Sequence, residues 1–409
     1  METSKPFSIQ KRMFLDAWLR VKENRGAEGI DKESLEEFEN DLKNNLYKLW
    51  NRMSSGSYFP SPVKAVEIPK KTGGIRRLGV PTVSDRVAQA VALAYLEPKL
   101  EPIFCVDSYG YRPGKSAIDA VGVTRERCWR YNWVLEYDIR GAFDNIDHEL
   151  LQRALRKHTD CKWVLLYTER WLKAPFQFMD GRQEKRNKGI PQGGIISPLL
   201  MNLFMHYAFD AWMARTFRKA PFARYADDGV VHCRTEAEAR LIRESLGKRF
   251  SQCKLELHPE KTSIIYCKDA RRKLDYDKVK FTFLGYDFQP RMAANQQGTI
   301  FLSYGPAVGR AAKKSFNKNI REMQLHRRTD LSLAEIASLC KAQVRGWIAY
   351  FRHYRPSALS LPLHCLNYRL VRWFKQKYGY TYRKARHVLK TIMVVQPKTF
   401  PHWEFGICY

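Results

Sequence analysis

The sequence lacks several features that would place it in common classes of protein. Its 409 residues contain no apolar run long enough for a membrane span, and Met1 to Gln10 contain no apolar core of a signal peptide. The nine cysteines are scattered without a Cys-x-x-Cys pair, so we interpret them as reduced thiols rather than as zinc ligands or disulfides. These absences favour a cytoplasmic protein without a membrane partner.

Acidic residues are scarce relative to basic ones. The 71 Lys and Arg residues exceed the 42 Asp and Glu residues, which gives a formal net charge of +29. Residues 301–409 alone hold 20 basic and 4 acidic residues. Such a basic, aromatic-rich segment favours a polyanionic partner over a merely solvated face. An anionic membrane surface fits less well, because no separate basic amphipathic helix stands out.

The stretch from Phe222 to Val231 places two adjacent carboxylates between apolar residues. Asp227 and Asp228 are followed directly by glycine, and Asp-Gly between apolar runs predicts a β-hairpin. We expect both aspartates at the tip of this hairpin, with Tyr225 and Val230 near its base. Because Asp tolerates turn geometry, a simple turn is the alternative for this stretch alone.

A third carboxylate, Asp138, ends an apolar, strand-like run that begins at Trp133. Strand ends often carry catalytic groups, and three carboxylates converging from two strands would form an oxygen-rich site for Mg²⁺. Two such ions can hold the attacking and leaving oxygens of a phosphoryl transfer. A helix cap or a surface charge is the alternative, and Asp144 and Asp147 fit that alternative better.

A glycine-rich turn lies between these sites, within residues 189–200. Two glycines after Gln192 let the backbone approach a ligand, to which Gln192 can then form a hydrogen bond. Ser197 followed by Pro198 predicts a helix start, with the serine as N-cap. The apolar residues that follow at helical spacing are more typical of a core than of a binding site.

These three stretches, in this order, resemble the reverse transcriptases. The motifs are Asp138-Ile-Arg-Gly-Ala-Phe-Asp, Gly189-Ile-Pro-Gln-Gly-Gly-Ile-Ile-Ser-Pro and Tyr225-Ala-Asp-Asp. More narrowly, nearly the whole chain is similar to the bacterial group II intron-encoded proteins. The resemblance implies an α+β right-hand polymerase fold: fingers, a palm with an antiparallel sheet backed by helices, and an α-helical thumb or maturase domain. It also implies RNA-directed DNA synthesis.

The resemblance assigns a catalytic site and its ligands. It implies that Asp138, Asp227 and Asp228 hold two Mg²⁺ ions, for which Mn²⁺ could substitute, with the carbonyl of Ile139 as a possible further ligand. The implied partners are dNTPs, an RNA template with its DNA primer, and the group II intron RNA whose splicing and mobility the protein assists. The resemblance also implies a bacterial cytoplasmic location.

Further residues match the family's binding positions. Those that match the nucleotide-binding site are Lys70, Arg76, Phe143, Gln192 and Lys261. Phe143 matches a steric gate against ribonucleotides, and Lys261 matches a lysine that can protonate the departing pyrophosphate, with an exposed loop lysine as the alternative. The primer grip matches Phe283, Leu284 and Gly285. The expected template and RNA contacts are Arg112, Lys115, Arg345 and Arg352.

The same resemblance predicts the domains. These are an N-terminal extension with fingers over 1–85, a fingers and palm domain over 86–290, a thumb or maturase domain over 291–385, and a short basic segment over 386–409 without an endonuclease domain. Helices are predicted over 8–23 and about 31–52, strands over 63–68 and 75–80, and a linker over 290–303.

Two other functions stay open at this stage. One is an RNA-binding splicing factor whose polymerase is vestigial, although the intact aspartates and Phe143 argue against it. The other is a reverse transcriptase recruited to CRISPR spacer acquisition or to phage defence. Intron RNA structure around the gene would separate them.

Overall fold

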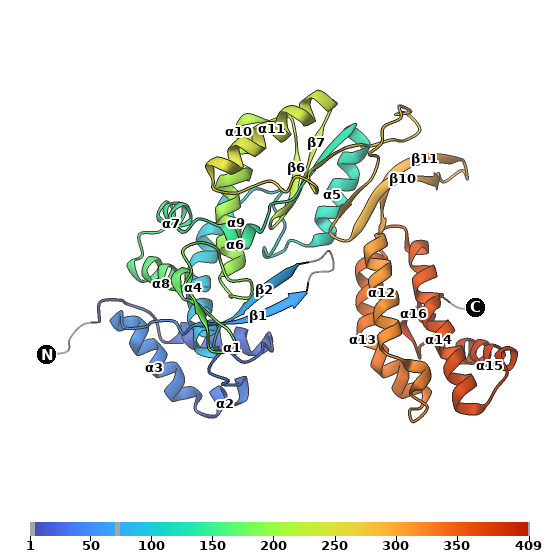
Figure 1. Cartoon of the computed structure of the whole chain (residues 1–409), viewed down its shortest axis with the longest axis horizontal. Helices are drawn as coiled ribbons and strands as arrows, with labels where there is room; N and C mark the ends of the chain where they lie inside the picture. Colours follow the sequence, from blue (N-terminus) through green and yellow to red (C-terminus); the bar gives the residue numbers. More distant parts are fainter. Residues whose placement is uncertain (1–4, 70–73, 408–409) are drawn as a thin grey trace. The chain divides into compact units, whose positions relative to one another are not determined.

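The computed structural model describes residues 5–69 and 74–407 (Figure 1). The chain forms two compact units, and neither unit is continuous in sequence. The first consists of Met1–Ala120 and Leu135–Ile264, and the second of Val121–Val134 and Ile265–Tyr409. Both units combine helices with largely antiparallel strands, which agrees with the predicted α+β class.

The first unit begins with helices that pack through aromatic residues. The helix predicted over 8–23 is confirmed as α1 (Arg12–Glu23). The next prediction was one helix, but the structure has two, α2 (Leu35–Asn40) and α3 (Leu42–Ser55). The break comes at Asp41, whose φ of −121° leaves the helical region. Trp18 of α1 stacks on Phe38 of α2, so the aromatic side chains fix both helices.

The two strands predicted over 63–68 and 75–80 are present and form a hairpin, called the fingers hairpin below after its expected place. Strands β1 (Val63–Pro69) and β2 (Ile75–Val80) pair antiparallel, from Lys64 opposite Val80 to Pro69 opposite Ile75. They belong to a sheet of order β2-β1-β4-β5, completed by β4 (Phe176–Gln177) and β5 (Gln183–Glu184). Lys70 lies outside the described residues.

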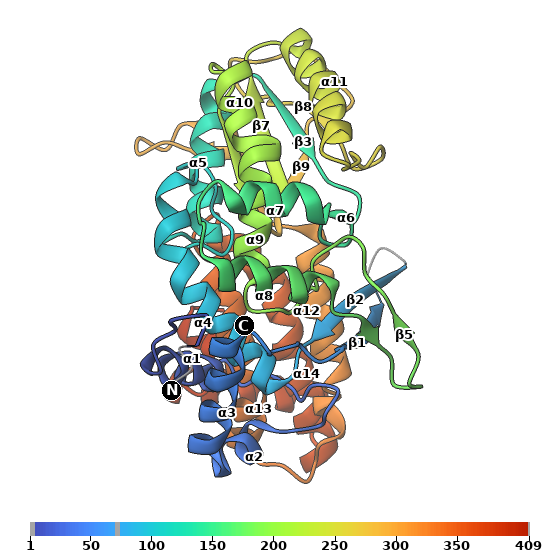
Figure 2. The same cartoon turned by 90° about the vertical axis from the view of Figure 1, so that its left-hand side faces the viewer.

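A second sheet has Asp138, Asp227 and Asp228 at or beside the ends of its strands. Its order is β6-β7-β3-β8, with β6 (Phe222–Tyr225), β7 (Asp228–Cys233), β3 (Trp133–Tyr137) and β8 (Ser263–Tyr266). The helical elements between residues 83 and 252, several of them labelled in Figure 2, are α4 (Val83–Leu100), η1 (Glu101–Ile103), α5 (Ala117–Arg130), α6 (Ala142–Asn145), α7 (His148–Arg156), α8 (Lys162–Lys173), α9 (Ser197–Met205), the π-helix η2 (His206–Asp210), α10 (Ala211–Thr216) and α11 (Glu236–Gln252).

Aromatic packing joins this sheet to its helices. Tyr137 of β3 is 2% exposed and lies between Phe209 of η2 and Phe250 of α11, with ring centroids 4.9 and 6.0 Å away. Phe209 also contacts Phe222 of β6. Burial of such side chains holds the strands rigidly against the helices, so groups at the strand ends have fixed positions.

The second unit contains a three-stranded sheet and a helical region. The sheet has the order β11-β10-β9, with β9 (Phe281–Phe283), β10 (Tyr286–Ala294) and β11 (Ile300–Val308). The helices, orange to red in Figure 1, are α12 (Arg310–Glu322), η3 (Leu325–Arg327), α13 (Leu333–Phe351), η4 (Pro356–Leu359), α14 (Ser360–Tyr378), α15 (Tyr382–Val395) and α16 (Pro401–Glu404). Phe316 of α12 stacks on Trp347 of α13, with ring centroids 4.4 Å apart, so this contact joins the two helices.

The predicted linker over 290–303 is wrong, because these residues form most of the β10–β11 hairpin. Pairing continues from Tyr286 opposite Val308 to Ala294 opposite Ile300. The side-chain oxygen of Asn295 accepts the backbone N–H groups of Gln297 and Thr299, at 3.0 and 2.8 Å. The polar residues that suggested a linker are therefore the tip of an exposed hairpin, where polar and glycine residues are also expected.

Neither the cysteines nor the helices contradict the expectations from composition. The eight cysteines that the structure describes are all free. Across residues 5–69 and 74–407, no helix is both long and apolar enough to cross a membrane.

Candidate active site

Asp227 and Asp228 lie at the turn of the β6–β7 hairpin. The predicted hairpin is confirmed, with Tyr225 paired to Asp228 as the last pair before the turn. The position of the turn was predicted wrongly, since Ala226 and Asp227 form it and Asp228 already belongs to β7. Ala226 has a φ of +56°, a left-handed conformation that few residues other than glycine adopt.

Gly229 has a different role from the one its position suggested. It is paired with Arg224 within the hairpin rather than forming the turn. A Cβ atom at Gly229 would lie 2.3 Å from both Cζ and Oη of Tyr137. Glycine is therefore required because the ring of Tyr137, which extends from β3, lies directly against β7 at this position.

Asp138 follows the last residue of β3, as predicted. Its carbonyl oxygen accepts the N–H of His258 at 2.8 Å, and Ile139 forms an isolated antiparallel bridge with Leu257. The N–H of Arg140 donates to the carbonyl of Glu256 at 2.9 Å, so hydrogen bonds flank the bridge. In such a non-hydrogen-bonded pair, the carbonyl of Ile139 points away from the opposite strand. That direction leaves it available as a ligand.

Asp138 lies close enough to the turn for its charge to influence the ionisation of Asp227 and Asp228. Desolvation, followed by the charges of Asp227 and Asp138, raises the pKa of Asp228 to about 7. Desolvation and the charge of Asp138 also raise the pKa of Asp227. Water still reaches the side chain of Asp228. The raised pKa of Asp228 thus has two causes, desolvation and the charges of the neighbouring aspartates. A bound cation would relieve the second cause.

The residues at this site fit a divalent cation. Carboxylate and carbonyl oxygens are the ligands preferred by Mg²⁺ and similar hard ions. Nζ of Lys261 now lies 2.8 Å from Oδ2 of Asp138. Within the described part of the chain, no group of three His, Cys, Asp or Glu side chains is already arranged around a metal position.

The raised pKa of Asp228 predicts a pH-dependent stability in the absence of metal. Because the folded protein holds this proton more tightly than the unfolded chain, ionisation of Asp228 destabilises the fold as pH rises from about 4 to about 7. We expect the melting temperature of wild type, relative to that of Asp228→Asn, to fall across this window in EDTA. Differential scanning fluorimetry of both proteins from pH 4.5 to pH 8.5 measures this difference. A pH-independent difference would contradict the assignment.

The glycine-rich turn packs against the fingers hairpin. Nε of Arg76 donates to Oε1 of Gln192 at 2.5 Å, and the N–H of Gly79 donates to the carbonyl of Gln192 at 2.8 Å. A Cβ atom at Gly193 would lie 2.5 Å from the carbonyl oxygen of Gly79. The charge of Arg76 also lowers the pKa of Asp227, although desolvation raises it overall. The structure thus brings Arg76 and Gln192 together near the aspartates.

The start of α9 differs slightly from its prediction. The helix begins at Ser197, but its N-cap is Ile196, whose side chain makes no capping hydrogen bond. Pro198 lies in the first turn, as predicted. The shift by one residue leaves the helix in place behind the glycine-rich turn.

Phe143 connects the region of Asp138 to the glycine-rich turn. It lies in α6 and is 8% exposed. Its carbonyl oxygen accepts the N–H of Ile190 at 2.7 Å. A Cβ atom at Gly189 would approach the same carbonyl oxygen to 3.0 Å. These contacts fix the backbone of Phe143 beside the loop that carries Gln192.

Arg112 and Lys115, which the sequence suggested as template contacts, are engaged within their own loop. The guanidinium of Arg112 is 7% exposed and donates to the side chain and carbonyl of Glu101 and to the carbonyls of Cys105 and Ser108. Those five hydrogen bonds use all its N–H groups, so they favour a structural role. Nζ of Lys115 donates to the carbonyl of Val106 at 3.0 Å.

The remaining predicted residues belong to the second unit. Leu284 and Gly285 form the turn between β9 and β10, with φ values of +50° and +81°. Oη of Tyr350 donates to the carbonyl of Leu284 at 2.8 Å, so a neighbouring helix holds this strained turn. Arg345 and Arg352 are exposed, one on α13 and one at its C-cap.

Sequence reasoning missed a buried ion pair beside the β6–β7 turn. Arg224 and Asp210 are both fully buried and lie 2.6 Å apart, from Nη2 to Oδ2. Arg224 occupies the middle of an apolar strand, where an arginine is rare without a partner. That unusual placement was the available signal, but the sequence did not identify the partner.

Comparisons with known proteins agree with this geometry. Residues 68–288 match the family described as reverse transcriptase (RNA-dependent DNA polymerase), and residues 313–391 match the group II intron, maturase-specific domain. Protein YkfC of Escherichia coli is 31% identical over 300 residues, which cover 64% of this chain and 74% of YkfC. Group II intron-encoded protein LtrA of Lactococcus lactis is 26% identical over 382 residues, which cover 77% of this chain and 59% of LtrA.

A third relative is a much longer protein than this chain. The putative COX1/OXI3 intron 1 protein of Saccharomyces cerevisiae is 28% identical over 260 residues, 62% of this chain but only 30% of that protein. The first family match covers more than half of this chain and includes every residue from Asp138 to Asp228. The chain therefore belongs to the reverse transcriptase family of RNA-dependent DNA polymerases, and within it to the group II intron-encoded proteins that carry a maturase domain.

Proposed function

We propose that this protein copies RNA into DNA at the site formed by Asp138, Asp227 and Asp228, and that it binds its group II intron RNA to assist splicing and mobility. One observation carries the catalytic part. The end of β3 and the β6–β7 turn bring three carboxylates so close that desolvation and their mutual repulsion raise the pKa of Asp228 to about 7. Such crowding suits a cation and a polyanionic substrate.

Reverse transcriptases in general use divalent metal ions, and we propose two Mg²⁺ ions held by the three aspartates and the carbonyl of Ile139, with Mn²⁺ as a possible substitute. Such ions supply positive charge at the attacking and leaving oxygens. The chain itself contributes position: phosphoryl transfer depends mainly on alignment and on preorganised charge. The rigid β3 and β7 strands provide that alignment for the side chains at their ends.

Several basic and polar groups would act on the incoming dNTP. Arg76 offers a forked guanidinium to the phosphates, and Gln192, which now accepts its hydrogen bond, steadies it. Lys70 is assigned the same role by family position alone. We assign to Lys261, at 2.8 Å from Asp138, the donation of a proton to the departing pyrophosphate.

Phe143 is proposed to exclude ribonucleotides by occupying the space of a 2′-hydroxyl. Phe143→Ala is expected to raise incorporation of rNTPs relative to dNTPs on the order of 10- to 100-fold, because the excluded group then finds room. Primer extension with dTTP and UTP in parallel measures the ratio of the two kcat/KM values. Phe178→Ala removes another buried phenylalanine, 8% exposed, and serves as the control. An unchanged ratio in Phe143→Ala would rule out the gate.

Binding of intron RNA is assigned mainly to the basic second unit. Arg345 and Arg352 present exposed guanidinium groups from one helix and its C-cap, and RNA phosphates are the complementary ligands. Polyanion binding of this kind weakens steeply with salt. A splicing assay with the cognate intron tests this part separately from DNA synthesis.

The decisive experiment for the catalytic part is extension of oligo(dT) on poly(rA) with dTTP and Mg²⁺. We compare wild type with Asp227→Ala and verify that both are folded and bind template–primer. Extension by wild type alone supports the proposal. Failure of folded wild type to extend the primer would favour an RNA-binding splicing factor whose polymerase is vestigial. Dependence on a CRISPR or phage-defence context instead of an intron would favour the other alternative.

A further inference from the structure

A π-helix interrupts the long helical segment behind the catalytic turn. Helix α9 continues into the five-residue η2 (His206–Asp210) before α10 begins. The N–H of Ala211 bonds to the carbonyl of His206, five residues earlier instead of four. Such segments are rare, and each inserts a residue that rotates the following side chains around the helix axis. The insertion therefore decides which way Asp210 points.

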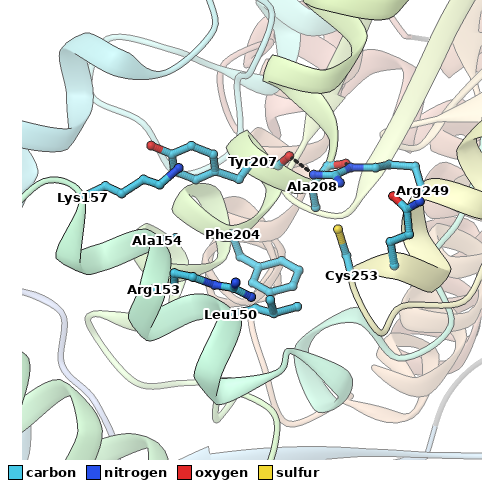
Figure 3. A pocket seen from close by; sticks show the side chains of 10 residues that line it. Leu150, Arg153, Ala154, Lys157, Phe204, Tyr207, Ala208, Arg249 and Cys253 are labelled. Carbon is cyan, nitrogen blue, oxygen red and sulfur yellow. Dashed lines mark hydrogen bonds between the residues drawn. The ribbon is translucent and has the colours of Figure 1, made fainter.

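The π-helix leaves some backbone carbonyl groups without their usual helical hydrogen bonds. A side chain of α11 donates to two of them. Arg249 donates to the carbonyl of Tyr207 at 2.8 Å and to that of Ala208 at 3.2 Å. Figure 3 shows Arg249 reaching Tyr207 across one side of a cavity of about 340 Å³ that also contains Phe204 and Leu150. The π-helix is thus held by a specific side chain, as expected for a defined feature of the fold.

Asp210, the last residue of the π-helix, holds Arg224 in a two-pronged ion pair. Nε of Arg224 lies 2.7 Å from Oδ1 of Asp210, and Nη2 lies 2.6 Å from Oδ2. Both side chains are 0% exposed. Two parallel bonds fix the plane of a guanidinium as well as its position. The remaining N–H groups of Arg224 consequently point in set directions.

One of those remaining groups holds the catalytic turn. Nη1 of Arg224 donates to the carbonyl oxygen of Ala226 at 2.7 Å and to Oδ1 of Asn202 at 3.1 Å. Ala226 precedes Asp227 and has the left-handed φ of +56°. An alanine in that conformation is strained and persists only where its surroundings fix it. The hydrogen bond from Arg224 is such a constraint.

The loop around Gly110 closes the other side of the turn. A Cβ atom at Gly110 would lie 2.4 Å from the backbone nitrogen of Ala226. Nδ2 of Asn202 donates to the carbonyl of Gly110 at 2.7 Å, so Asn202 connects this loop to Arg224. Nη2 of Arg224 also donates to Oγ of Ser108 at 2.8 Å. A single buried guanidinium therefore links the π-helix, the loop and the turn.

We propose that Arg224, oriented by Asp210 on the π-helix, is a positioning residue that holds the Ala226–Asp227 turn in its catalytic conformation. The inference rests on the proposed function, because it assumes that Asp227 and Asp228 are catalytic. A buried ion pair by itself adds little stability compared with apolar side chains of similar volume. The specific bond to Ala226 is what an apolar replacement would lose.

The test replaces the pair by apolar residues that preserve packing. Arg224→Met combined with Asp210→Leu leaves no uncompensated buried charge, so the fold is expected to persist. We expect kcat for oligo(dT) extension on poly(rA) to fall on the order of 10- to 100-fold, as misplacement of catalytic groups produces. The KM for dTTP and the Kd for template–primer should stay within about twofold of wild type, because neither dTTP nor the template–primer contacts the buried Arg224–Asp210 pair directly.

A matched control removes another ion pair that also binds carbonyl groups. Arg272 pairs with Asp269 in the second unit and donates to the carbonyls of Cys128 and Tyr131. The double variant Arg272→Met and Asp269→Leu should keep the wild-type kcat. If both double variants lose kcat equally, the effect is general and the proposal is wrong.

A second variant is needed in case the protein with Arg224→Met and Asp210→Leu does not fold. Arg224→Lys keeps the charge, but one ammonium group cannot reach Asp210 with two parallel bonds and Ala226 at once. It should lower kcat with KM unchanged. Wild-type kcat in either folded variant overturns the proposal. Lack of extension by wild type itself would instead contradict the proposed function, so the two failures are distinguishable.

Discussion

Asp138→Ala is expected to lower kcat for primer extension about 10³-fold or more while changing the free energy of unfolding by less than about 1 kcal/mol. The catalytic loss follows because one of three carboxylates disappears from the site. The effect on stability is small because the ion pair with Lys261 is partly exposed, with 53% of the lysine side chain accessible to solvent. The backbone bond from His258 to the carbonyl of Asp138 does not depend on the side chain.

Asp147→Ala is the matched control, and the opposite pattern is expected. Asp147 also pairs with a lysine, Lys254, at 2.6 Å, but its side chain caps α7 by accepting the N–H of Leu150 at 2.9 Å. Loss of the cap should cost about 1 kcal/mol of stability and leave kcat unchanged. Chemical denaturation and steady-state extension of both variants provide the comparison. If Asp138→Ala kept its kcat, or Asp147→Ala lost it, the assignment of Asp138 would be refuted.

Gly229→Ala is expected to destabilise the first unit by about 1–3 kcal/mol or more and to remove most activity. The new methyl group would meet Tyr137 at 2.3 Å, and that ring cannot move freely because Phe209 and Phe250 pack against it. Relief requires β3 and β7 to separate, which would displace Asp138 from Asp228. Denaturant unfolding monitored by circular dichroism measures the first effect, and primer extension the second.

Two further variants sharpen this prediction. Gly247→Ala lies within α11 of the same unit, where a Cβ atom would make only an ordinary contact of 3.8 Å with Leu257. It should stabilise the protein by about 0.5–1 kcal/mol, because alanine favours a helix over glycine. Adding Tyr137→Leu to Gly229→Ala should restore part of the lost stability. If Gly229→Ala were as stable as wild type, the close approach of β3 to β7 would not be what requires glycine.

Local patterns were sufficient to predict the β1–β2 and β6–β7 hairpins and the end of β3. Asp138 follows β3, and the apolar stretches around Asp227 form β6 and β7, because alternating burial and turn signals are properties of a few neighbouring residues. The turn itself was misplaced by one residue. Gly229 lies within the strand pair against the ring of Tyr137, a residue distant in sequence, and a local pattern does not encode that contact.

Other features depended on contacts that no local pattern encodes. The π-helix was invisible because apolar residues continue at helical spacing on both sides of it. Arg224 is notable in an apolar strand, but only the folded chain shows that Asp210 is its partner. The hairpin over 286–308 was mistaken for a linker because its polar tip has the composition of both.

The discontinuity of the second unit has a consequence for how this protein can be divided. The maturase-specific match covers 313–391, yet the compact unit around it also includes Val121–Val134, which precede the catalytic turn by about 100 residues in the sequence. Nε1 of Trp129 donates to the carbonyl of Tyr304 at 2.7 Å, so that early segment contributes a partner to the later one. A fragment starting near residue 291 would lack this partner. The segment that matches the maturase-specific domain is therefore shorter than the unit that must fold together. An exchange of the C-terminal part between proteins has to preserve residues 121–134 as well.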